Sequence, residues 1–343
     1  MQSDAPTLRA RNASRLVAQA EAAATARPFQ TIPQIDISPL LEGTVDERLE
    51  VASAIRQACL EVGFFYVSDH GVDPSIVAAG FEAAERFFAL PEADKAAVSI
   101  LHSDKLRGYT GLLEENTDPD NNGDLHEAFD IGLDLANDDP DAHSGVYGWG
   151  ENQWPELQGF RDDVLAYYAA MDALCRALYR GFALSLDLDE DFFVDKMTKP
   201  IGELRLLRYP AQPVPDDKVL GIGAHSDYDA FTVLATDDVS ALEILNPAGD
   251  WIEAPPVDGT FIVNVGDLME RWTNDLYRST VHRAVNSSER DRYSIPYFSN
   301  IDPLEVISVL PSCQSPERPA RYEPVGAGEY VEACMRDAYG VDS

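Results

Sequence analysis

Three side chains of this sequence have the chemistry and the spacing of ligands for a transition metal. His225 and Asp227 are two residues apart in a run that continues through residues 231–234 and favours a β-strand. Residues i and i+2 of a strand point to the same face, so the imidazole and the carboxylate are expected to converge. His282 lies in a second β-branched run further along the chain. Two imidazoles and one carboxylate suit Fe(II) and leave its other coordination positions open.

A carboxylate clamp follows the second histidine. Arg292 and Ser294 are again i and i+2 in an expected strand, so both side chains point the same way. A planar guanidinium binds a carboxylate through two hydrogen bonds, and a hydroxyl beside it can donate one more. The sequence therefore predicts a metal site with a binding site for an anionic small molecule next to it.

Each of these features has an ordinary explanation when it stands alone. An isolated His-x-Asp pair usually has no function, and an isolated arginine on a strand usually lies on a solvated or ion-paired face. The joint order of His225, Asp227, His282, Arg292 and Ser294 is far more specific. The same three metal ligands would also suit zinc, so the pattern alone leaves the metal open.

The H-x-D, H and R-x-S pattern resembles that of the 2-oxoglutarate/Fe(II)-dependent dioxygenases of the isopenicillin N synthase-like family. The resemblance runs from about Ile32 to about Tyr339 and includes the segments GFFYVSDHGV and RFFALP. It implies a mainly β fold with flanking helices, a distorted double-stranded β-helix or jelly roll. It also implies an oxygenase that oxidises, most often hydroxylates, a small organic metabolite.

The resemblance assigns roles to the residues of the pattern. It implies that the two histidines and Asp227 hold Fe(II), with 2-oxoglutarate and O2 as cosubstrates. The far carboxylate of 2-oxoglutarate is then expected at Arg292, assisted by Ser294 and by Tyr209. Oxidation of the substrate would be coupled to release of succinate and CO2. The protein's share is positioning and electrostatics, and no catalytic residue beyond the metal centre is expected.

The substrate pocket is less well specified. In relatives, the regions that match Tyr109 and Phe129 lie over the active site and touch the substrate, so these two residues are expected in the pocket. Phe298 shares a strand face with Ser294 and is expected at the pocket mouth. The segments LRLLRYP, ERWTND, STVHR and RYSIPYF resemble fungal thymine hydroxylases and also many enzymes of specialised metabolism. The sequence therefore leaves the substrate, and the outcome of its oxidation, open.

Two other functions fit the same residues. The first is an isopenicillin N synthase-like oxidase or cyclase that uses no 2-oxoglutarate, because such enzymes can keep the R-x-S motif. The second is a non-catalytic or zinc-binding jelly-roll protein. Succinate release separates the first from the dioxygenase, and metal analysis with O2 uptake separates the second.

The composition argues against two classes of binding partner. The 343 residues carry a formal net charge of −34, which argues against nucleic acid and against an anionic membrane surface. We therefore expect a small-molecule substrate. The four cysteines have no C-x-x-C spacing, which indicates reduced thiols and favours a cytoplasmic location. Nothing in the sequence indicates the oligomeric state.

Three successive regions must position these residues. Residues 1–30 form an N-terminal extension, for which a helix is favoured over an organelle transit peptide. Residues 31–195 combine strands with amphipathic helices, expected over residues 44–61, residues 74–88 and a long stretch that begins at Phe160. Residues 196–343 are rich in strands, end in a helix over residues 329–339, and are expected to form the Fe(II)- and 2-oxoglutarate-binding jelly-roll core.

Overall fold

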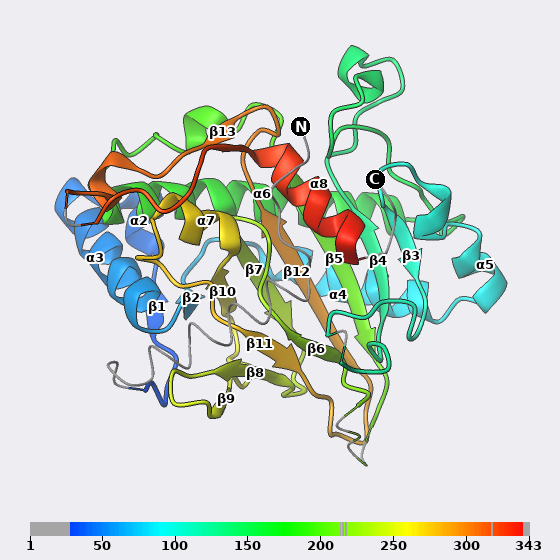
Figure 1. Cartoon of the computed structure of the whole chain (residues 1–343). Coiled ribbons are helices and arrows are strands. Elements are labelled where there is room, and N and C mark those ends of the chain that lie inside the picture. The colour runs from blue at the N-terminus through cyan, green and yellow to red at the C-terminus, as the bar shows by residue number, and fades with distance from the viewer. Residues whose placement is uncertain are drawn as a thin grey trace.

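The computed structural model describes residues 28–118, 120–212, 214, 216, 218–316 and 318–338. Within these ranges the chain forms two main β-sheets, with long helices along the outer side of the larger one (Figure 1). The helix expected in the N-terminal extension falls in residues 1–27, which lie outside the described residues. No helix in the described part of the chain is both long and apolar enough to cross a membrane.

The larger sheet has eight strands in the order β1-β2-β10-β7-β12-β5-β4-β3. Only the pair of β1 and β2 is parallel within this sheet. The strands are β1 (Gln34–Asp36), β2 (Phe64–Ser68), β3 (Gly108–Thr110), β4 (Glu127–Ile131), β5 (Gly202–Tyr209), β7 (Phe231–Thr236), β10 (Phe261–Val265) and β12 (Arg292–Ser299). Strands from before and after residue 196 therefore pair within one sheet, with β4 beside β5.

The smaller sheet is antiparallel, with the order β6-β11-β8-β9. Its strands are β6 (Ile222–His225), β8 (Leu242–Leu245), β9 (Trp251–Glu253) and β11 (His282–Ala284), and a separate pair joins β13 (Val306–Ile307) to β14 (Val325–Gly326). Two sheets with flanking helices confirm the predicted mainly β jelly-roll fold.

The helices are α2 (Ser38–Glu42), α3 (Val45–Glu61), α4 (Pro74–Phe88), α5 (Glu92–Ala96), α6 (Phe160–Ser185), α7 (Asp267–Trp272) and α8 (Ala327–Ala338). Side-chain caps mark the start of α3 and of α4. Thr44 and Glu47 form a capping box at the start of α3, which satisfies two backbone N–H groups that the helix leaves unpaired. Asp73 caps α4, and its side chain accepts a hydrogen bond from the Ser75 amide.

The larger sheet has one dry face and one face that lines a cavity. The dry face packs against α3, α4 and α6, where Phe182 of α6 contacts Phe231 of β7 with ring centroids 4.9 Å apart. Because side chains alternate along a strand, the residues between these core positions point to the opposite face. There they meet the smaller sheet and enclose the cavity described below.

One local prediction needs correction. The strand expected to carry both His225 and Asp227 ends at His225, and Asp227 follows in the connection from β6 to β7. The chain must leave the smaller sheet there to enter the larger one, so the ladder cannot continue. The two side chains still converge, but through this connection and not through strand alternation.

Candidate active site

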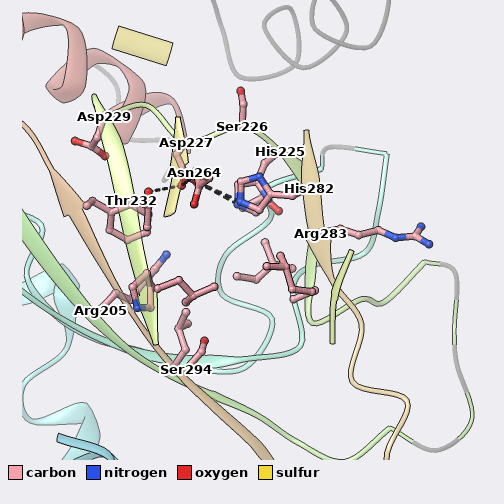
Figure 2. A pocket seen from close by; sticks show the side chains of 18 of the residues that line it. Arg205, His225, Ser226, Asp227, Asp229, Thr232, Asn264, His282, Arg283 and Ser294 are labelled. Carbon is pink, nitrogen blue, oxygen red and sulfur yellow. Dashed lines mark hydrogen bonds and ion pairs between the residues drawn. The ribbon is translucent and has the colours of Figure 1, made fainter. Parts of the chain in front are cut away.

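His225 and His282 lie directly opposite each other on β6 and β11. Their Nε2 atoms are 3.6 and 3.5 Å from Oδ1 of Asp227, and one ligand atom from each of the three residues lies within 4.8 Å of the others. Figure 2 shows the two imidazole rings and the Asp227 carboxylate close together at the cavity wall. The structure thus brings together all three metal ligands predicted from the sequence.

Backbone carbonyls fix the orientation of both imidazoles. Nδ1 of His225 lies 2.8 Å from the carbonyl oxygen of Gly223, and Nδ1 of His282 lies 3.1 Å from that of Thr280. A carbonyl oxygen can only accept, so each Nδ1 donates, and in the neutral ring Nε2 is left with its lone pair. This is the usual arrangement of metal-binding histidines, in which the second nitrogen sets the tautomer.

Two neighbours orient the Asp227 carboxylate. Its Oδ2 accepts hydrogen bonds from the Thr232 hydroxyl and from Nδ2 of Asn264, the latter at 2.7 Å. Oδ1 therefore remains for a metal ion. Burial by itself would raise the pKa of Asp227, but His282, His225 and Thr232 together hold that pKa well below its usual range. The carboxylate is ionised at neutral pH, as a ligand must be.

The two histidines differ in their electrostatic surroundings. Burial, and after it the neighbouring His282, lowers the pKa of His225 to about 4, so this ring is neutral at pH 7. Burial also opposes the charged form of His282, but the adjacent Asp227 outweighs it and raises the pKa of that ring. A set of two nitrogens and one carboxylate oxygen, open on the cavity side, fits Fe(II) with free positions for small molecules.

Arg292 is the second notable feature of this cavity. The residue is only 2% exposed, yet no carboxylate lies within ion-pair distance of its guanidinium among the described residues, and its Nε has no partner there. Its Nη1 donates to the Ser294 hydroxyl at 3.4 Å, and its guanidinium carbon lies 4.7 Å from the centre of the Tyr209 ring. A buried cation without a counter-charge is costly, so this arrangement is suited to an anionic ligand.

The cavity joins these two features. The larger sheet lines it with every second residue of β12, namely Arg292, Ser294, Pro296 and Phe298. The smaller sheet contributes both histidines, and α8 contributes Val331 and Met335. All six residues predicted for metal and cosubstrate therefore line one cavity.

Of the three residues predicted for the substrate pocket, only one lines the cavity. Phe298 lines the cavity, in agreement with the expectation. Tyr109 and Phe129 do not line it, because they are cross-strand partners on the face of the sheet that packs against α4. The Tyr109 hydroxyl donates to Glu127 at 2.6 Å within a buried ionic cluster. The residues next to them along β3 and β4 do not line the cavity either, and a pocket role for Tyr109 and Phe129 stays a prediction.

Some residues that line the cavity were not predicted from the sequence. Thr232 and Asn264, which orient Asp227, lie in apolar strands and look like ordinary strand residues. Arg205 of β5 lines the cavity and pairs with Glu115 at 2.7 Å and with Asp130 at 2.9 Å. Alternation along β5 places Arg205 on the same face as Tyr209, so the strand pattern could have indicated it.

Two protein-family models match this sequence. Residues 201–301 match the model of the 2OG-Fe(II) oxygenase superfamily. Residues 32–157 match that of the non-haem dioxygenase in morphine synthesis N-terminal region. The 2-oxoglutarate-Fe(II) type oxidoreductase hxnY of Emericella nidulans is 35% identical over 319 residues, which cover 90% of each chain. The chain belongs to the 2OG-Fe(II) oxygenase superfamily.

Other members of the 2OG-Fe(II) oxygenase superfamily are similar to this chain over most of its length. Homoarginine-6-hydroxylase 2-ODD-233 of rice is 34% identical, over 88% of this chain and 96% of its own. The crystal structure of Neurospora crassa T7H with alpha-KG is 31% identical with a TM-score of 0.80, over 90% of this chain and 96% of that one.

Membership in the 2OG-Fe(II) oxygenase superfamily settles the class. The chain is an oxidoreductase that uses Fe(II) and 2-oxoglutarate. It shares the isopenicillin N synthase-like fold. The 2-oxoglutarate-independent oxidase and the non-catalytic or zinc-binding protein are thereby set aside as readings of the same motif.

Proposed function

We propose that the enzyme hydroxylates a small organic molecule held in this cavity. In this proposal His225, Asp227 and His282 hold Fe(II), while Arg292, Ser294 and Tyr209 bind the far carboxylate of 2-oxoglutarate. One observation carries the assignment: a buried arginine without a carboxylate partner among the described residues opens onto the same cavity as three converging metal ligands. An anionic cosubstrate supplies the missing counter-charge.

The protein's own residues would contribute order and charge control. When bound, Fe(II) with 2-oxoglutarate supplies the activation of O2 and the oxidative decarboxylation to succinate and CO2. Thr232 and Asn264 hold Asp227 with one oxygen turned to the metal position. The backbone carbonyl of Gly223 keeps His225 in the tautomer that can bind a metal. The apolar lining from Leu207, Pro296 and their neighbours limits water beside the reacting groups.

The substrate end of the cavity is the part away from Arg292. Along an extended strand, Arg292 and Phe298 of β12 lie roughly 20 Å apart, and Tyr228 and Met335 of α8 also line the cavity. Related structures hold thymine or 5-formyluracil together with alpha-KG, and one relative is named for hydroxylation of homoarginine. These support a small organic substrate and hydroxylation as the outcome.

A titration under anaerobic conditions tests the assignment. Fe(II) and then 2-oxoglutarate are added to the metal-free protein, and the weak visible absorption band of the chelated 2-oxo acid is followed. Arg292→Ala is expected to weaken 2-oxoglutarate binding by roughly 10- to 100-fold, the value of a charge-assisted hydrogen bond. Arg290→Ala is the matched control, because Arg290 is exposed and pairs with Asp238 on the surface. Unchanged affinity in Arg292→Ala would refute the cosubstrate site.

Two further assignments belong to the same proposal. We propose that residues 31–195 serve as a supporting region and residues 196–343 as the core that carries all metal and cosubstrate ligands. The separate family matches over residues 32–157 and 201–301 support this division. We also propose a cytoplasmic location, which is supported by four cysteines that are all buried and free of disulfide bonds.

A further inference from the structure

Glu203 lies in the same cross-strand row as the groups that orient the metal ligands. Glu203 of β5 pairs with Phe298 of β12, and Phe298 pairs in turn with Thr232 of β7. Thr232 donates its hydroxyl to Asp227. All of these side chains line the cavity. Glu203 is thus on the metal-facing wall, at the opposite end of β5 from Tyr209.

The Glu203 carboxylate has no hydrogen bond or ion pair to any other described residue. The nearest candidate on its own strand is Arg205, but that guanidinium already pairs with Glu115 and Asp130, at 2.7 and 2.9 Å. Arg205 therefore has two carboxylate partners other than Glu203. A carboxylate at a cavity wall without a cation is the opposite of the arrangement at Arg292.

Arg107 is a second guanidinium that favours the ionised form of Glu203, but it forms no ion pair with Glu203. The buried Arg107 donates to the backbone carbonyl oxygens of Leu133, Gly148 and Gly150, and it forms no ion pair within the described ranges. Asp229 lines the same end of the cavity and adds a second carboxyl, contacted by Nδ2 of Asn300 at 3.3 Å. The substrate end therefore carries two carboxyl groups, and no cation among the described residues forms an ion pair with either of them.

Burial raises the pKa of the Glu203 carboxyl to about 7, against the lowering effect of Arg205. The ionised form of the Glu203 carboxylate is thus disfavoured. A ligand that brings a positive charge reverses this, because it pairs with the carboxylate and favours its ionised form. The ring of Phe298, directly across the strand pair, offers a second favourable contact to a cation.

We propose that Glu203 determines substrate specificity, and that the substrate carries a protonated nitrogen, of an amine, guanidine or amidine, which donates hydrogen bonds to the Glu203 carboxylate. This inference rests on the proposed function, since it takes the Arg292 end as the site of 2-oxoglutarate. The opposite charges at the two ends of the cavity then determine where each ligand binds. The anionic cosubstrate binds beside Arg292, and the cationic group of the substrate binds beside Glu203.

Matched pairs of ligands test the charge requirement. The enzyme loaded with Fe(II) and 2-oxoglutarate is titrated anaerobically with n-alkylguanidinium ions from propyl to hexyl and with the corresponding n-alkylureas. The two series have the same shape and differ in charge. Binding is followed by calorimetry and by perturbation of the visible chelate band, so the readout does not depend on turnover. We expect at least one guanidinium to bind at least tenfold more tightly than its urea.

Variants then assign the preference to Glu203. Glu203→Gln should reduce the guanidinium preference to within twofold and leave the chelate band of 2-oxoglutarate intact. Glu203→Asp keeps the charge and should keep the preference, which guards against a folding defect in the first variant. Glu85→Gln is the control, because Glu85 is exposed on α4, a helix that packs on the dry face of the sheet. It should behave like the wild-type protein.

Three results would overturn the inference while 2-oxoglutarate binding stays intact. They are ureas that bind as tightly as guanidinium ions, a preference that survives in Glu203→Gln, and a complete lack of guanidinium binding to the wild-type protein. Absence of the chelate band in the wild-type protein would overturn the proposed function and this inference with it. A failure confined to Glu203 is thereby distinguished from a failure of the cosubstrate site.

Discussion

Arg292 and Tyr209 are cross-strand partners at one end of the β5–β12 pair, and the guanidinium carbon lies 4.7 Å from the centre of the tyrosine ring. The ring covers one face of the guanidinium, whose Nη1 donates to the Ser294 hydroxyl and whose Nε has no partner among the described residues. A planar cation held in this way loses little further freedom when a carboxylate binds. Tyr209 thus prepares Arg292 for an anion, in addition to any contact by its own hydroxyl.

Replacement of Tyr209 separates the two contributions. Tyr209→Phe keeps the ring and should weaken 2-oxoglutarate binding by roughly fivefold, the value of one hydrogen bond. Tyr209→Leu also removes the cation–π contact and should weaken it further. Titration of the Fe(II)-loaded variants with 2-oxoglutarate measures both. Equal affinities in the two variants would show that the ring does not support Arg292.

Metal affinity should depend on the hydroxyl of Thr232. Thr232→Val keeps the shape of the side chain but removes the donor to Asp227, so Fe(II) affinity is expected to fall roughly 10-fold or more, as for other residues that orient metal ligands. Thr232→Ser restores the donor and should recover most of the affinity. Competition with a chelator of known affinity provides the measurement. A Val variant that binds Fe(II) as tightly as the Ser variant would contradict this role.

The pH dependence of stability should reveal Glu203. Its pKa is raised from 4.5 to about 7 in the folded protein, so between these values the folded state binds more protons than the unfolded state. The contribution of Glu203 to the free energy of unfolding is therefore largest at acid pH and is lost as the pH rises through this range.

Glu203→Gln should remove that dependence. Relative to the wild-type protein, the variant should gain about 1–3 kcal/mol between pH 5 and pH 8, given about 1.4 kcal/mol per pKa unit. Urea unfolding of the metal-free proteins at both pH values gives the comparison. The Glu85→Gln variant should show no such gain. A constant difference between Glu203→Gln and the wild-type protein at the two pH values would contradict the prediction.

The loop before β4 should also support the metal strand. Asp124 is 1% exposed and accepts backbone hydrogen bonds from Thr117 at 2.7 Å and from Gly223 at 2.9 Å. Asp124→Ala leaves two buried N–H groups without this acceptor, at a cost of roughly 1–3 kcal/mol for each. Asp124→Asn keeps one acceptor oxygen and should lose less. Chemical unfolding compares the two variants. Fe(II) affinity should fall in the same order, because Gly223 lies two residues before His225.

The residues that we propose for metal and cosubstrate binding could be identified from the sequence because closely spaced residues of suitable chemistry carry the pattern. His225, His282 and Arg292 each stand in a short β-branched or alternating run, and strand direction alone brings Arg292 and Ser294 to one face. The end of β6 at His225 could not be predicted, since it depends on where the chain passes between the sheets. Periodicity carries no information on that crossing.

Local sequence patterns did not identify the residues at the substrate end of the cavity. The family resemblance placed Tyr109 and Phe129 over the pocket, whereas both rings contact Phe87 of α4 on the other face of the sheet. The partners of Arg205 lie in β4 and in the loop before it, far from β5 in the sequence. The unpaired carboxyl of Glu203 is likewise apparent only when all surrounding elements are in place.

The contribution of α8 to the cavity has a consequence for how this enzyme can change over evolution. In the proposed assignment, iron and 2-oxoglutarate bind residues within or between paired strands, where a substitution disturbs the ladders. Val331 and Met335 instead reach the cavity from a helix. Methionine adapts its shape easily, so new substrates can be acquired through α8 while the chemistry is inherited unaltered.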